Sequence, residues 1–177
     1  MRTRDETIKR QLEFILKARF TGRDLIVYFD CMPEKMLRRA ITLFSEVYPS
    51  ETVISDEQFG FIGYMLSTNK MVEQESFSNF IRSISTINYS IEQKEKLVNI
   101  TKDNIFSLCN GLTFEFDNFL ALLLNQEQLA DYVKWMADIE DEAVLMRAMG
   151  ILQYERFDRV PVEIIESLKQ TIKNKLK

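Results

Sequence analysis

The chain has 177 residues, of which 46% are hydrophobic and 28% are charged, and its formal net charge at pH 7 is −4. It contains no histidine and two cysteines, so it lacks the imidazole base of Ser-His-Asp and Cys-His catalysis and the ligands of histidine or four-thiolate zinc sites. The composition is typical of an ordered globular protein, and the length predicts one domain over residues 1–177.

Apolar residues recur at three- and four-residue spacing along the chain, which predicts an all-α fold of about eight or nine helices on short connections. Gly22, Pro33 and Pro161 stand at predicted helix ends, where glycine and proline commonly occur. Ser90 and Gln93 have the spacing of a capping box. Besides a short helix in 25–29, we expect helices in chain order over 8–20, 33–47, 56–66, 77–87, 91–111, 116–124, 126–139, 140–157 and 161–176.

The predicted packing is an irregular helical bundle, because no linker, low-complexity tract or regular helix spacing divides the chain. The alternative is a HEAT-like helical-hairpin repeat, which is supported by a five-residue pattern that occurs at 77–81 (FSNFI) and again at 116–120 (FDNFL), 39 residues later. We expect Cys31 and Cys109 to be buried free thiols, because their number and spacing fit neither a metal site nor a disulfide framework.

Charge is distributed unevenly along the chain. Residues 1–39 carry ten Lys or Arg and six Asp or Glu, residues 113–158 carry three and ten, and residues 159–177 carry five and two. The local net charges are therefore +4, −7 and +3. The acidic section predicts electrostatic steering of a basic partner.

The densest acidic run contains Asp138, Glu140, Asp141 and Glu142. It does not match a calcium-binding loop, because alanine stands at the turn position that requires glycine and methionine at the position of the bidentate glutamate. Three interpretations remain open: an acidic first turn that complements the dipole of the following helix, a docking surface, and a carboxylate site for a metal or for catalysis. Asp138 and Glu142 would lie one helical turn apart only if a single helix contained both.

A helix over 126–139 would place Leu129, Val133 and Met136 on its inner side, with its carboxylates facing outward. Trp135 would lie at the edge of the inner side, where a tryptophan forms either the rim of the core or an interface hot spot. The predicted partner-binding residues are Glu127, Asp131, Trp135, Asp138, Glu140, Asp141 and Glu142.

The expected function is binding by a non-enzymatic protein–protein interaction protein. Its most concrete form is an acidic helical inhibitor or immunity protein that occludes a basic partner such as a toxin nuclease. Two alternatives use other features of the chain. A nucleic-acid-binding regulator would use the basic N- and C-terminal helices, and an enzyme would need carboxylates from separate helices to hold a metal. We assign no catalytic, cofactor-binding or metal-binding residue.

The sequence predicts no membrane span, because its longest apolar run, 119–124, is far shorter than the roughly 20 residues that a spanning helix needs. The first residues are polar and lead into no continuous apolar stretch, so we expect no secretory signal. We therefore expect the protein to work in the cytoplasm, where its cysteines would stay reduced.

Overall fold

The computed structural model describes residues 3–17, 27–28, 31–33, 36, 39–40, 43, 54, 56–67, 78, 80–82, 84–85, 87–111 and 114–177. All eight elements with defined bounds in these ranges are α-helices, which confirms the predicted all-α helical fold. The chain divides into two compact units, Met1–Asp103 and Asn104–Lys177. Each unit is described by itself, and the assignment of one domain to the whole chain stays a prediction.

The first unit begins with α1, which spans Arg4–Lys17. Its inner side buries Ile8 and Leu12, as their spacing predicts. Thr3 and Glu6 close the start of the helix by a reciprocal pair of hydrogen bonds: the Thr3 amide donates to Glu6 Oε2 (2.8 Å), and the Glu6 amide donates to Thr3 Oγ1 (3.3 Å). This pair satisfies two of the backbone donors that a helix start leaves unpaired.

Two further helices of this unit, α4 (Asp56–Ser67) and α6 (Ile91–Asp103), pack against each other. Gly63 permits a close approach, because a Cβ atom at this position would lie 3.1 Å from Cδ1 of Ile100 on α6. The buried side of α4 is the one that apolar spacing predicts. It consists of Phe59, Ile62, Met65 and Leu66.

The predicted capping box at the start of α6 is confirmed. The Ser90 amide donates to Gln93 Oε1 (3.0 Å), and the Gln93 amide donates to Ser90 Oγ (3.1 Å). The Gln93 side chain also donates to the carbonyl oxygen of Ile54 (3.3 Å) and to Asp56 Oδ1 (3.0 Å). These bonds explain how a buried glutamine is tolerated, because each of its amide atoms has a partner.

The prediction of a single continuous helix over 91–111 is wrong at one position. A turn at Asn104 separates α6 from α7, which spans Ile105–Gly111. Just before the turn, the Thr101 hydroxyl donates to the carbonyl oxygen of Val98 (2.7 Å). Such a side-chain bond competes with the regular backbone ladder and favours a bend.

Several predicted elements lie wholly or partly outside the described residues. Val27, Tyr28, Met36, Arg39, Ala40 and Leu43 are helical, in agreement with the predicted helices over 25–29 and 33–47. Pro33 is described and is not helical, and the remaining positions of both predicted helices are not described. The first copy of the repeated pattern contains two undescribed positions, 77 and 79, so the HEAT-like repeat stays a prediction.

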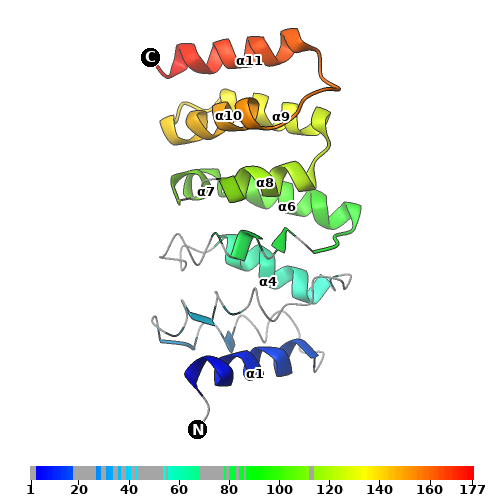
Figure 1. The fold of residues 1–177 in the computed structure, drawn as a ribbon, viewed down its shortest axis with the longest axis vertical. Coiled ribbons are helices and arrows are strands. Elements are labelled where there is room, and N and C mark those ends of the chain that lie inside the picture. The colour runs from blue at the N-terminus through cyan, green and yellow to red at the C-terminus, as the bar shows by residue number, and fades with distance from the viewer. Residues whose placement is uncertain are drawn as a thin grey trace. The chain divides into compact units, whose positions relative to one another are not determined.

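The second unit has one central helix among its five. It contains α7, α8 (Phe114–Leu123), α9 (Gln126–Ala137), α10 (Glu142–Tyr154) and α11 (Val162–Lys175). Among these, α10 contacts all four others, and α9 also contacts α8 and α11. Figure 1 shows α9 and α10 side by side, with α11 against them. The arrangement is a bundle centred on α10.

The core of the second unit combines aromatic rings with aliphatic stripes. Phe116 and Phe119 of α8 are fully buried. Ile165, Leu168 and Ile172 of α11 are buried as predicted, and burial of each such side chain contributes roughly 1.5–3 kcal/mol. Leu176, which the spacing places on the same side, is the C-cap of α11; its amide donates to the carbonyl oxygen of Ile172 (3.0 Å), and its side chain is 37% exposed.

The two cysteines differ in environment. Cys109 of α7 is buried, as predicted, whereas Cys31 is exposed, so its assignment to the core is wrong. Cys31 lies in a turn, where the chain offers no helix face to bury it.

The longest helices in the described part of the chain are α1 and α11, with 14 residues each. No helix in that part of the chain combines the length and apolar character needed to cross a membrane.

Candidate functional site

The predicted partner-binding residues lie on α9 and at the start of α10, and we call them the acidic segment: Glu127, Asp131, Trp135, Asp138, Glu140, Asp141 and Glu142. The start of α9 is set by a capping box. The Gln128 amide donates to Asn125 Oδ1 (2.8 Å), and the Asn125 amide donates to Gln128 Oε1 (3.0 Å). Glu127 therefore stands in the first turn, where the helix dipole favours a carboxylate.

The orientation of α9 is the predicted one. Leu129, Val133 and Met136 are at most 3% exposed and form the inner side. The outer side contains Glu127, Asp131, Lys134 and Asp138, all of them exposed. Their spacing of three or four residues places them along one line of the helix surface, so three carboxylates and one ammonium group share this line.

Trp135 lies between the two sides of α9 and is half-buried. Its ring packs edge-on against Tyr132, with 5.6 Å between ring centroids and 64° between ring planes. In sequence it follows Asp131 by one helical turn and precedes Asp138 by three residues, so exposed carboxylates flank it on the same helix. The predicted position at the edge of the buried side is confirmed.

The end of α9 differs from the prediction. The helix ends at Ala137, two residues earlier than expected, and Asp138 is its C-cap, with its amide directed to the carbonyl oxygen of Trp135 (3.2 Å). Lys175 of α11 donates a hydrogen bond from Nζ to the carbonyl oxygen of Ala137 (2.5 Å). An ammonium group at this end complements the negative end of the helix dipole. Sequence reasoning missed this role because the two residues are 38 positions apart.

Asp141 has a structural role within the acidic segment. It is the N-cap of α10, and its Oδ1 accepts a hydrogen bond from the amide of Val144 (3.0 Å). Glu142 stands in the first turn of the same helix. The interpretation of these two residues as an acidic helix start is therefore confirmed.

The predicted helix over 140–157 is shorter than expected, because α10 spans Glu142–Tyr154. Since α9 has already ended at Ala137, Asp138 and Glu142 are not one turn apart on one helix. The arrangement that a general acid/base pair on a single helix would require is absent at these two described residues.

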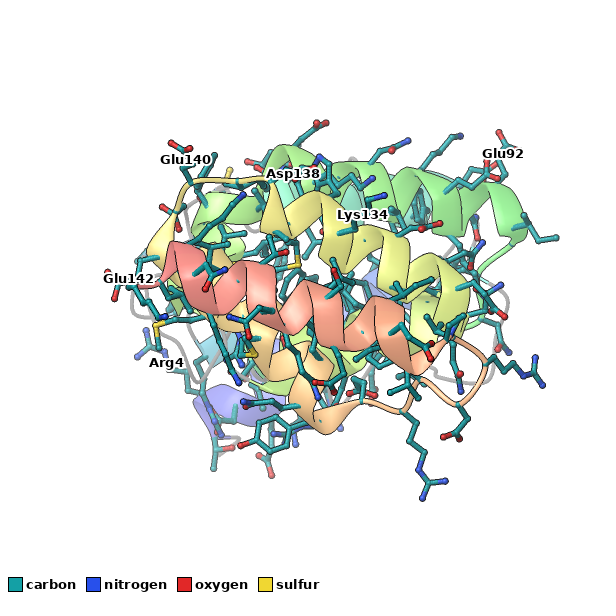
Figure 2. All side chains as sticks on the ribbon, turned by 90° about the horizontal axis from the view of Figure 1, so that it is seen from above. Arg4, Glu92, Lys134, Asp138, Glu140 and Glu142 are labelled. Atoms are coloured by element: carbon teal, nitrogen blue, oxygen red, sulfur yellow. The ribbon has the colours of Figure 1, made fainter. Side chains whose placement is uncertain are left out.

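The remaining carboxylates of the acidic segment are exposed: Glu127, Asp131, Asp138, Glu140 and Glu142. None of the ion pairs among the described residues involves them. Figure 2 shows Glu140 and Glu142 projecting outward at the connection between α9 and α10, and Lys134 and Asp138 at the exposed side of α9. Within the part of the chain that the structure describes, no group of three or more potential metal ligands occurs.

A second polar cluster, which the sequence analysis did not single out, lies between α8 and α10. Asp117 is 3% exposed, and its Oδ2 lies 3.0 Å from Nη2 of Arg147. No hydrogen bond among the described residues satisfies either Asp117 oxygen or Nε of Arg147. We call Asp117 and Arg147 the buried pair. The sequence contains a signal for this cluster, since the acidic Asp117 lies between Phe116 and Phe119, but this segment was interpreted as a possible repeat.

Gly150 provides the space for the buried pair. A Cβ atom at this position would lie 2.6 Å from Nη2 of Arg147 and 3.6 Å from Oδ2 of Asp117. The guanidinium therefore rests against the backbone of α10, where a larger residue would displace it.

Burial raises the pKa of Asp117 to about 6, although the Arg147 charge acts to lower it, and the charge of Glu155 raises it further. Burial also raises the pKa of the Cys109 thiol to about 12, and the Asp117 charge adds to that effect. Cys109 is thus a neutral core thiol at pH 7.

Comparison of the chain with protein-family models, with curated proteins and with solved structures finds no match.

Proposed function

We propose that this chain is a non-enzymatic protein-binding protein whose acidic segment docks against a basic partner protein. In its most concrete form, it is an acidic helical inhibitor or immunity protein that occludes the cationic surface of a toxin such as a nuclease. The observation that carries this proposal is the line of exposed carboxylates along α9, Glu127, Asp131 and Asp138, beside the half-buried Trp135. None of these carboxylates takes part in an ion pair among the described residues. Such carboxylates keep their charge available for cations of a partner.

The rigidity of α9 supports the proposal. Its start is closed by the Asn125–Gln128 capping box, and its end receives the ammonium group of Lys175. Its inner side is buried over the whole length of the helix. Carboxylates on a helix fixed in this way need little ordering when they bind, so less of the interaction energy is lost as entropy.

The two kinds of group contribute at different ranges. Carboxylates attract a basic surface over roughly 8 Å at physiological salt and so raise the association rate. Tryptophan acts in contact, where its large ring loses water and becomes an anchor. We assign the steering role to Asp131, Asp138, Glu140 and Glu142, and the anchoring role to Trp135. Lys134, which shares the outer side of α9, opposes the approach of a cation.

The basic-helix alternative receives less support on α11. Lys169 lies 3.4 Å from Glu166, and Lys175 is bonded to Ala137, so two ammonium groups already serve contacts within the second unit. Nucleic-acid binding is therefore an outcome that the experiment must distinguish, as is a carboxylate-held metal.

The experiment is capture from the lysate of the source cell at low and moderate salt, with the bound protein and nucleic acid both identified. The variant Asp131→Lys/Asp138→Lys reverses two charges of the acidic segment. Its matched control is Glu95→Lys/Asp103→Lys, which makes the same change at two exposed positions of α6. A third variant, Lys134→Glu, removes the opposing cation.

The proposal expects one basic protein in stoichiometric amount. The α9 charge reversal releases it, the α6 control retains it, and Lys134→Glu retains it to higher salt. Capture of nucleic acid alone, lost as salt rises, would contradict the proposal and favour the basic helices. Equal loss in both double variants would show that only net charge matters and would remove the assignment to α9.

A further inference from the structure

The buried pair differs from the other ion pairs of the described residues. Its side chains are 5% and 19% exposed, whereas both partners of the Arg39–Asp5 and Lys96–Glu92 pairs and the carboxylate of the Lys169–Glu166 pair are well exposed. Asp117 is buried, and no hydrogen bond from the described residues replaces its hydration. A buried carboxylate in this situation is costly, and a single close cation offsets only part of the cost.

The groups that face Asp117 leave few ways to offset its charge. From α10 it meets the cation of Arg147 and the opposing charge of Glu155, and from α7 the neutral thiol of Cys109. From α9, the titratable residue on the buried side is Tyr132. Among the described residues, Asp117 and Glu155 therefore share the one cation of Arg147, and uptake of a proton from solvent would neutralise Asp117.

The position of Arg147 allows its guanidinium to move away from Asp117 into solvent. Its side chain retains contact with solvent, and Gly150 has no side chain that would trap the guanidinium. Rotation of the flexible arginine stem would carry the charge into water without movement of the α10 backbone.

We propose that the buried pair is a proton-operated latch between α8 and α10. A proton taken from solvent by the Asp117 carboxylate releases the Arg147 guanidinium from Gly150 into water, and loss of that proton draws the guanidinium back. The Arg147 half of the latch lies on α10, the helix that contacts α7, α8, α9 and α11. The latch does not depend on the proposed docking function.

The test follows three NMR signals of the full-length protein between pH 4.5 and 8: Cγ of Asp117, Nε of Arg147 and the amide of Gly150. All three are expected to move together, with a midpoint near the pKa of about 6 that burial gives Asp117. In Asp117→Asn, the Arg147 and Gly150 signals are expected to stay constant over this range.

Two variants move the midpoint in opposite directions. Gly150→Ala displaces the guanidinium, so the carboxylate loses its cation and the midpoint rises by about one pH unit. Glu155→Gln removes an opposing charge, so the midpoint falls. The matched control Glu142→Gln, at the exposed start of α10, leaves it unchanged.

The latch is overturned if Asp117 titrates below about pH 4.5. It is also overturned if the Arg147 and Gly150 signals stay constant while Asp117 takes up its proton. If Gly150→Ala does not fold, the comparison of Glu155→Gln with its control Glu142→Gln decides the outcome: a midpoint that does not fall in Glu155→Gln rejects the proposal.

Discussion

The ammonium group of Lys175 at the end of α11 lies 2.5 Å from the carbonyl oxygen of Ala137 and so closes the end of α9. This contact joins α11 to α9, the helix that bears Glu127, Asp131 and Trp135 of the acidic segment. It also places a cation at the negative end of the α9 dipole.

Replacement of Lys175 by methionine is expected to destabilise the protein by about 1–2 kcal/mol, because a charge-assisted hydrogen bond and a favourable dipole interaction are lost together. Urea unfolding measures the change. The matched control is Lys173→Met, two residues earlier on the same helix and exposed. Equal losses in the two variants would show that the contact with Ala137 contributes nothing.

Within the acidic segment, Asp141 caps a helix, whereas Glu140 is an exposed surface residue, and substitutions of the two are expected to differ in their effect on stability. Asp141→Ala removes the acceptor of the Val144 amide and is expected to cost about 1 kcal/mol, the usual value for a lost N-cap. Glu140→Ala removes an exposed charge that makes no ion pair among the described residues, and its effect on unfolding should lie within about 0.5 kcal/mol of zero. Thermal or urea unfolding of the two variants tests this difference, and a larger loss in Glu140→Ala would contradict it.

Trp135 is the single tryptophan of the chain, so its fluorescence reports the local charge directly. With each quenching constant divided by that of neutral acrylamide, the value for caesium ions is expected to exceed the value for iodide by roughly two- to fivefold. The reason is that nearby carboxylates concentrate cations and repel anions. In Asp131→Lys/Asp138→Lys the order of the two ions should reverse, whereas Glu95→Lys/Asp103→Lys should preserve it. Equal quenching by both ions in the unaltered protein would remove the electrostatic basis of the proposed docking surface.

The raised pKa of Asp117 predicts that one contribution to the stability of the protein decreases as pH rises. Its pKa is raised from 3.8 to about 6 in the folded protein, so the folded state binds the proton more tightly than the unfolded state. The corresponding stability is fully present below about pH 3.8 and is lost as pH rises through about 6. Because an asparagine side chain cannot ionise, the stability of Asp117→Asn relative to the unaltered protein should increase between pH 4 and pH 7 by up to roughly 3 kcal/mol.

Urea unfolding of the two proteins at several pH values measures this difference. The comparison cancels the titration of the exposed carboxylates, which both proteins share. A difference that stays constant with pH, or that moves in favour of the unaltered protein as pH rises, would contradict the assignment of a raised pKa to Asp117.

The sequence predicted the helices and their buried sides well. The inner residues of α4, α9 and α11 were identified from spacing alone, because the side of a helix that faces the core is set by a local period of 3.6 residues. The capping box of Ser90 and Gln93 was also readable, since its two residues are three positions apart. Helix ends were predicted less accurately: α9 ends at Ala137, two residues earlier than predicted, and Asn104 interrupts the predicted helix over 91–111.

The sequence by itself thus determined that the protein is all-α and which side of α9 carries carboxylates, because both follow from residues within a few positions of each other. Only the tertiary structure decided that Asp117 meets Arg147 over Gly150, and that Lys175 closes the end of α9. These contacts depend on how α8, α10 and α11 pack, and helix packing is set by the fit of whole surfaces, which no local pattern encodes.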